Sequence, residues 1–145
     1  AMLREGMAML DYIEHLVTSE KIDCAFVRCG RFRAAIRPEH YEAMARDMDD
    51  LRAIAGVESF MVPQPEQGTE IGSEVFFGGS VLPNDASLHP ALYHSGLMAR
   101  VRALGGIIAG QAAARRIDRE GQGFRIVTER GAVGARNVVI ATNGY

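Results

Sequence analysis

The chain has 145 residues, of which 48% are hydrophobic and 23% are charged, and its 16 basic and 18 acidic residues give a formal net charge of −2. This composition is that of a globular protein and excludes a disordered chain, and the near balance of charge disfavours a nucleic-acid-binding domain, which is usually strongly basic. The sequence has no apolar run of the roughly 20 residues that a membrane-spanning helix needs and no secretory signal at its start. Its two cysteines, Cys24 and Cys29, are too few for a disulfide framework, so we expect a cytoplasmic protein.

The chain is expected to begin with a helix and a β-hairpin. Between Met2 and Ser19, apolar residues recur every three or four positions, which predicts an amphipathic helix. Two mostly apolar segments, 24–29 and 31–36, flank Gly30. Because glycine accepts the positive φ of a tight turn, this arrangement predicts that the two segments pair as a hairpin.

A second helix and several short strands should follow. Pro38 suits a first helical turn, and the apolar face of this helix extends to about Ala55, before a glycine that would end it. Short strands are predicted at 57–62, 73–77 and 80–82, with Gly78-Gly79 as a turn or bulge between the last two.

The last third of the chain combines one helix with a series of strands. The helix begins at Pro90 and ends at Gly105-Gly106, and Gly96 within it is interpreted as a packing contact. Strands are predicted at 107–109, 112–118, 124–128, 132–133 and 137–141. The last of these is continuously apolar, which is typical of a central strand in a parallel sheet. The whole pattern predicts a mixed α/β fold.

The residues by themselves show no complete active site. His89 and His94 are five positions apart, which does not place two metal ligands on one helix face, and no Cys-x-x-Cys is present, so no metal site is expected. The sequence contains neither a Gly-x-Ser-x-Gly nucleophile elbow nor a Gly-x-Gly-x-x-Gly phosphate loop. The cluster of Gly105, Gly106 and Gly110 follows a helix instead of opening one. These residues alone indicate an α/β domain that is incomplete.

Several motifs nevertheless resemble one family. In the second half of the chain they are Leu88-His-Pro-Ala-Leu-Tyr-His-Ser-Gly-Leu97, Ala103-Leu-Gly-Gly106, Thr128-Glu-Arg-Gly131, Ala135-Arg136 and Val138-Val-Ile-Ala-Thr-Asn-Gly-Tyr145. In order and spacing they resemble the D-amino-acid-oxidase-like family of FAD-dependent oxidoreductases. The upstream segments are similar, more narrowly, to the γ-glutamylputrescine oxidoreductase branch: Leu10-Asp-Tyr-Ile-Glu-His-Leu16, Cys29-Gly-Arg-Phe32, Pro38-Glu-His-Tyr41, Glu70-Ile-Gly72 and Gly78-Gly79.

The resemblance implies an α+β architecture made of two parts. An antiparallel, cap-type sheet with helices would occupy 1–87, on the substrate side, and part of a Rossmann-like FAD-binding sheet would occupy 88–145. The family's amino-terminal strand, Gly-rich loop and carboxy-terminal third have no counterpart in this sequence. We therefore expect an internal fragment of a longer protein.

The resemblance also implies cofactor-binding residues, all of them small or polar. They are Ala113 and Ala114 beside the adenine ring, and Ala141, Thr142, Asn143 and Gly144 near the FAD pyrophosphate. The family usually has Val at the position of Ala114, which would loosen packing around the base. Arg33, Phe76 and Phe77 are candidates for contact with substrate, with roles in the core or at the surface as the alternative. No catalytic residue is assigned.

The implied function is oxidation of a small-molecule amine or amino acid, γ-glutamylputrescine-like, by hydride transfer to the flavin, which carries the chemistry. FAD would belong to the full-length protein, and this chain alone should bind it weakly or not at all. Two alternatives remain, a non-catalytic binding or assembly module that reuses the fold and a small stand-alone enzyme. Exposed strand edges further predict self-association through the 107–141 strands.

Overall fold

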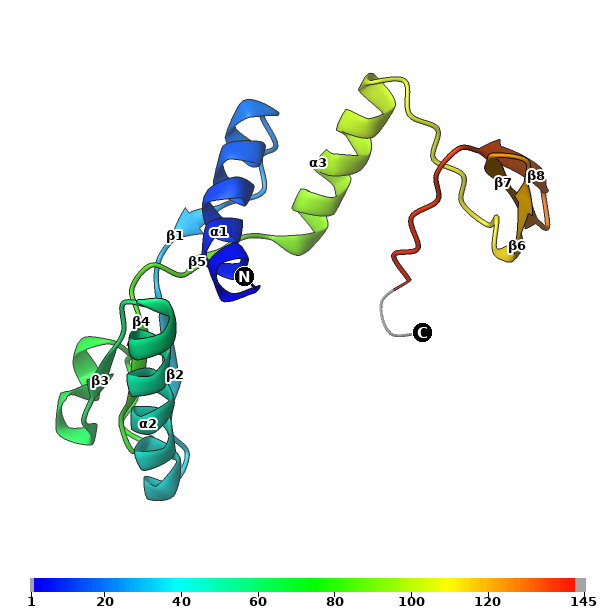
Figure 1. Cartoon of the computed structure of the whole chain (residues 1–145). Coiled ribbons are helices and arrows are strands. Elements are labelled where there is room, and N and C mark those ends of the chain that lie inside the picture. Colours follow the sequence, from blue (N-terminus) through cyan, green and yellow to red (C-terminus); the bar gives the residue numbers. More distant parts are fainter. Residues whose placement is uncertain (1, 143–145) are drawn as a thin grey trace. The chain divides into compact units, whose positions relative to one another are not determined.

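The computed structural model of the chain describes residues 2–142, which form two compact units (Figure 1). One unit ends at Leu104 and the other begins at Gly105, and each is described by itself. The elements of unit 1 are α1 (Met2–Ser19), β1 (Val27–Arg28), β2 (Arg31–Ala34), α2 (Pro38–Ala55), β3 (Phe60–Val62), the 3-10 helix η1 (Gln64–Thr69), β4 (Gly79–Leu82), β5 (Ala86–Ser87) and α3 (Pro90–Ala103). Unit 2 consists of β6 (Ala114–Glu120), β7 (Gly123–Thr128) and β8 (Gly131–Ala135).

The three predicted helices are confirmed, and local signals explain their ends. Pro38 lies in the first turn of α2, and Gly56 ends that helix in the left-handed conformation (φ +66°), with its N–H donating to the carbonyl of Arg52. Pro90 likewise lies in the first turn of α3. Proline fixes a helical φ and lacks the N–H that would be left unpaired there, and glycine accepts a positive φ without strain.

The end of α1 is a Schellman motif. The N–H of Ile22 donates to the carbonyl of Val17 (2.8 Å), and that of Lys21 donates to Thr18 (3.2 Å). Lys21 takes the left-handed conformation (φ +54°), which glycine usually occupies in this motif. The motif brings Ile22 back onto Val17, and with Cys24 these two form a buried apolar cluster. Partly buried side chains around the cluster are Ile13, Phe26, Leu88, Tyr93 and Leu97.

The predicted hairpin around Gly30 is wrong, because β1 and β2 do not pair with each other. Instead β1 pairs with β5, and β2 lies antiparallel to β4 in a three-stranded sheet of order β2-β4-β3. Gly30 has the expected positive φ, but its N–H donates to the carbonyl of Asp85 (2.8 Å). The chain therefore bends at Gly30 without reversing, and both strands find their partners in one returning segment, 45 to 60 residues away in sequence.

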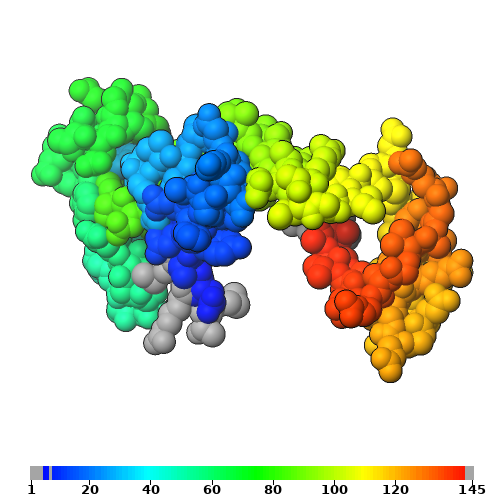
Figure 2. Space-filling view, turned by 90° about the horizontal axis from the view of Figure 1, so that it is seen from above, coloured from blue at the N-terminus to red at the C-terminus, as the bar shows by residue number. Residues whose placement is uncertain are grey.

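A second group of buried side chains belongs to α2 and the three-stranded sheet. Met48 is completely buried on α2, and Val62, Val81 and Leu82 are each less than 10% exposed on β3 and β4. In the space-filling view, α1 and the segment after it (blue) lie between α3 on one side and the residues of α2 and β3 on the other (Figure 2). Unit 1 therefore has two small cores, one on either side of the strands that connect them.

The strand predicted at 73–77 is also wrong, since these residues form a series of bends. Only the end of the segment reaches the sheet, where the N–H of Phe77 donates to the carbonyl of Ala35 and the N–H of Ala35 to that of Gly78 (both 2.8 Å). The N–H of Gly78 is bound by the side chain of the buried Gln67 (3.3 Å). The side chain of Gln67 thus accepts the hydrogen bond that a neighbouring strand would otherwise accept.

Unit 2 is an antiparallel meander of order β6-β7-β8, with an irregularity of register between Ala114 and Arg116. The predicted strands at 112–118, 124–128 and 132–133 correspond to these three. No strand forms at 107–109 or 137–141, so those two predictions are wrong. Val139 is 88% exposed. An apolar run becomes a buried strand only when neighbouring strands supply its hydrogen bonds, and the described residues supply none.

The mixed α/β class with antiparallel sheets and helices is confirmed. The predicted functional boundary after residue 87 stays a prediction. Among residues 2–142, no helix is both long and apolar enough to span a membrane.

Candidate functional site

The predicted cofactor residues lie at two places in unit 2. Ala113 and Ala114 are exposed at the start of β6, where Ala114 pairs with Thr128. Ala141 and Thr142 are exposed in the extended segment after β8. Asn143 and Gly144 lie outside the described residues.

These positions do not make a complete FAD site. A dinucleotide is normally held in a concave pocket, with its pyrophosphate at the N-terminus of a helix. The described part of unit 2 contains no helix, and the candidate residues are open to solvent. The methyl side chains of Ala113 and Ala114 leave the backbone accessible, which suits a backbone contact to a base. The residues present therefore fit one side of such a site and do not enclose the cofactor.

The substrate-side candidates lie in unit 1, at one end of the three-stranded sheet. Arg33 is half-buried on β2 and faces Ser80 across the strand pair. Phe77 is hydrogen-bonded through its backbone to Ala35, two residues beyond Arg33 in sequence, and Phe77 as a whole is 37% exposed. Phe76 is half-buried. The structure thus brings Arg33 and Phe77 near one strand end.

The histidines have structural or surface positions. His89 precedes α3, where its Nδ1 accepts a hydrogen bond from the N–H of Leu92 (3.4 Å) and its own N–H donates to the carbonyl of Cys24 (2.7 Å). His94 is exposed on α3. Within the part of the chain that the structure describes, no three His, Cys, Asp or Glu side chains gather as metal ligands.

A hollow of about 490 Å³ opens beside the end of α1. Its charged lining residues are Glu14, Lys21 and Asp23, and the buried Cys24 lies among the apolar ones. Glu14 is already bound to Arg28, and Lys21 and Asp23 are exposed. The hollow therefore offers no converging set of polar groups.

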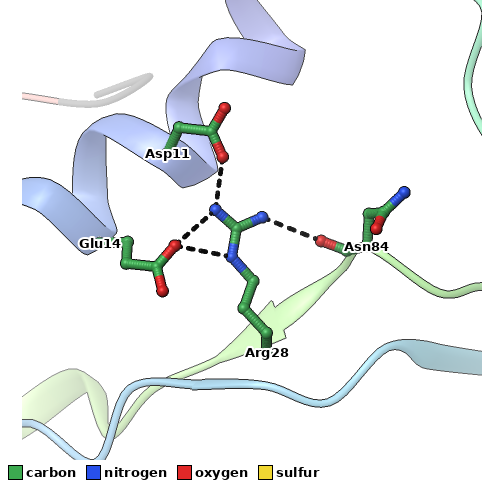
Figure 3. A network of polar contacts seen from close by, with 4 residues as sticks. All are labelled: Asp11, Glu14, Arg28 and Asn84. Atoms are coloured by element: carbon green, nitrogen blue, oxygen red, sulfur yellow. Dashed lines mark hydrogen bonds and ion pairs between the residues drawn. The ribbon is translucent and has the colours of Figure 1, made fainter.

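Among the described side chains of unit 1, Arg28 makes the most hydrogen bonds, and sequence reasoning missed it (Figure 3). Its Nη2 donates to Asp11 Oδ1 (2.5 Å) and Glu14 Oε2 (2.8 Å), and its Nε donates to the same Glu14 oxygen (3.0 Å). Its Nη1 donates to the backbone carbonyl of Asn84 (3.3 Å). Hydrogen bonds to Asp11 and then Glu14 raise the pKa of Arg28 above its ordinary value, so the guanidinium stays charged. These partners are 14 to 56 residues away in sequence, and no local motif indicates them.

Comparison with known families finds that the profile of the family described as FAD dependent oxidoreductase (DAO) matches residues 1–145. Comparison with curated protein sequences finds no match.

Solved structures show the same fold. A glycine oxidase from Geobacillus kaustophilus is 21% identical with a TM-score of 0.79, and the match covers 92% of this chain and 36% of that one. An L-proline dehydrogenase from P. horikoshii is 14% identical with a TM-score of 0.75, and the match covers 97% of this chain and 37% of that one. An L-amino acid deaminase from Proteus myxofaciens, in complex with anthranilate, is 17% identical with a TM-score of 0.69, and the match covers 88% of this chain and 30% of that one. The chain spans about a third of the length of these proteins.

Proposed function

Because the chain belongs to the family of FAD-dependent oxidoreductases (DAO), we propose that it forms part of a flavoenzyme that oxidises a small amino acid or amine. The observation that carries this proposal is the family match over all 145 residues. FAD is the cofactor of the full-length protein. The names of the structural relatives, which specify glycine, L-proline and L-amino acids, support a substrate with an amino group.

The finer proposal is a γ-glutamylputrescine-like substrate. It is supported by the upstream segments 10–16, 29–32, 38–41 and 70–72, all of which lie in unit 1. An extended substrate of this kind combines an amine with a carboxylate. Arg33, a half-buried cation at the end of the sheet, has the charge to bind such a carboxylate.

We also propose that the two parts of the chain have different roles. Residues 1–87 would contribute to the substrate side, and 88–145 to the FAD side. The exposure of Ala113 and Ala114 supports contact with the adenine ring, and the segment that begins at Ala141 would approach the pyrophosphate. A cytoplasmic location is supported by the two cysteines, both of which are free thiols.

The experiment uses both the chain and the natural gene product that contains it. The chain is mixed with FAD, desalted and examined for flavin absorbance. We expect no stoichiometric flavin, because the described residues do not enclose it, and a yellow protein would contradict that expectation. The full gene product should carry flavin, and the flavin absorbance should bleach anaerobically with γ-glutamylputrescine. Bleaching by glycine or proline instead would keep the family reaction and reject the finer substrate.

One observation favours a second function, a non-catalytic binding or assembly module. The FAD candidates of unit 2 are open to solvent. A full gene product that binds no flavin, and turns over none of these amines, would support the module and reject the enzyme.

A further inference from the structure

The four short strands of unit 1 that connect its two cores form one bent ribbon. β1 continues through Cys29 and Gly30 into β2, and β4 continues through 83–85 into β5. β1 pairs with β5 and β2 with β4, both antiparallel. The N–H of Gly30 donates to the carbonyl of Asp85 between the two pairs. The two connections therefore run side by side from one core of unit 1 to the other (Figure 1).

The register shows that this ribbon contains one extra residue. Arg28 pairs with Ala86, and Arg31 pairs with Leu82. Between these two pairs, one strand advances by three residues and the other by four. Such a bulge bends a strand pair and changes the direction of whatever follows it. Here the additional residue lies in the segment 83–85, which we call the ribbon bulge.

Polar side chains hold the ribbon bulge from three elements. Arg28 of β1 binds the carbonyl of Asn84, and Arg31 of β2 pairs with Asp85 (2.8 Å). The amide of Asn84 donates to Glu58, in the segment between α2 and β3 (2.9 Å). Arg28 is itself fixed to Asp11 and Glu14, which are one turn apart on the same face of α1. The guanidinium thus links α1 directly to the bulge.

Two different packing groups lie on either side of the ribbon bulge. β1 leads back to Cys24 in the cluster with α1, and β5 leads on to Leu88 and α3 around the same cluster. β2 and β4 belong to the sheet that packs against α2. The ribbon bulge therefore lies at the junction between the sheet and the group formed by α1 and α3.

We propose that Arg28 is a positioning residue, whose guanidinium fork fixes the angle of the ribbon bulge and so the orientation of the β2-β4-β3 sheet relative to α1. The inference rests on the proposed function in one respect, because this sheet is the proposed substrate side and α3 leads toward the proposed FAD side. The orientation would then set how a bound substrate is presented to the cofactor.

Exposure argues that Arg28 determines geometry more than stability. The side chains of Arg28, Asp11 and Glu14 are 31%, 79% and 47% exposed. Ion pairs this open to solvent add little to the free energy of unfolding. The fork nevertheless binds two carboxylates and one carbonyl at once, in directions that a planar guanidinium can meet and a lysine ammonium cannot. Removal of the Arg28 guanidinium should therefore let the angle of the ribbon bulge vary, while both cores of unit 1 stay folded.

The test measures the angle as a distance between two spin labels. Cysteines are introduced at His15 on α1 and Glu42 on α2, both exposed, in a Cys29→Ser background, while the buried Cys24 stays unlabelled. The parent should give one narrow distance distribution. Arg28→Met should broaden or shift it, and Arg28→Lys should not restore it. The melting temperature should change little in both.

Two further variants test whether the effect is specific to the Arg28 network. Arg46→Met, on α2, removes an exposed arginine whose side chain makes no hydrogen bond or ion pair with a described residue, and should leave the distribution narrow. The double variant Asp11→Asn/Glu14→Gln keeps Arg28 but removes its anchors, and should broaden the distribution even if Arg28→Met fails to fold. A broad distribution in the parent, or a narrow unshifted one in Arg28→Met, Arg28→Lys or the double variant, would overturn the proposal. The distances are measured without flavin or substrate, so they are independent of whether the proposed function holds.

Discussion

Gly96 of α3 lies directly against Ile22, the residue with which the Schellman motif of α1 ends. A Cβ atom at Gly96 would overlap Cγ2 of Ile22, and would lie 3.2 and 3.3 Å from its Cβ and Cγ1. The packing role expected for Gly96 is therefore confirmed. The absence of a side chain at Gly96 lets α3 approach Ile22 closely. This contact adjoins the buried apolar cluster of Val17, Ile22 and Cys24.

Gly96→Ala should destabilise the chain, although alanine is the better helix former. The added methyl group must displace Ile22, and overpacking of this kind costs about 1–3 kcal/mol. Urea unfolding followed by circular dichroism measures the loss. Gly6→Ala is the matched control, because Gly6 is exposed on α1 with nothing near its Cβ position, and it should gain up to about 1 kcal/mol. Equal gains in both variants would refute the close contact.

Lys21→Gly should stabilise the chain by relieving the left-handed conformation of residue 21. A non-glycine residue in this region carries a steric penalty, part of which is offset by the greater freedom of glycine in the unfolded chain, so the net gain should be about 0.5–1 kcal/mol. Lys21→Ala keeps the penalty and serves as the control for loss of the charged side chain. If alanine stabilises as much as glycine, the explanation from backbone strain fails.

Ser80→Ala should also raise the free energy of unfolding. The Ser80 hydroxyl is fully buried at the centre of the sheet and has no hydrogen-bond partner among residues 2–142. Removal of an unsatisfied buried polar group should gain roughly 1 kcal/mol. The exposed Ser87 provides the comparison, since Ser87→Ala should change stability by less than about 0.5 kcal/mol. A loss of stability in Ser80→Ala would show that its hydroxyl has a partner, such as water.

Self-association is expected through one face of the unit 2 meander. Strand register places Ile117, Ile126 and Val133 on the same face, and Ile117 and Val133 are 40% and 61% exposed. Light scattering should give a mass above that of the monomer, and Ile117→Thr/Val133→Thr should lower it, because threonine keeps the strand while reducing apolar area. Ala132→Thr, on the opposite face, is the control. A monomer at high concentration would rule this association out.

The sequence predicts the helices far better than the strands. Pro38, Gly56 and Pro90 act on their own neighbours, so the ends of α2 and α3 can be inferred from local chemistry. A strand depends on partners that lie elsewhere in the chain. The positive φ of Gly30 is correctly expected, but its N–H binds the carbonyl of Asp85, and nothing local distinguishes that pairing from a hairpin.

The candidate site divides in the same way. Small residues at 113–114 and 141–142 are visible in the sequence, and the resemblance assigns them to the cofactor. Their surroundings depend on elements that the described residues do not contain. The Arg28 network is not visible at all, because its contacts join α1, β1 and the ribbon bulge across long sequence separations. Charged residues at such spacing are indistinguishable from an ordinary solvated surface until the fold is known.

The turn that ends α1 also holds the sole lysine of the sequence. A lysine-specific protease therefore has one peptide bond to cut, the bond between Lys21 and Ile22, at the junction of α1 with the rest of the chain. In the folded state this bond is held by the hydrogen bond from Ile22 to Val17 and by the burial of Ile22. Cleavage requires the turn to open locally. The rate of this single cut would therefore report how often the end of α1 opens. Because the sequence has only one lysine, no other cleavage would contribute to the measured rate.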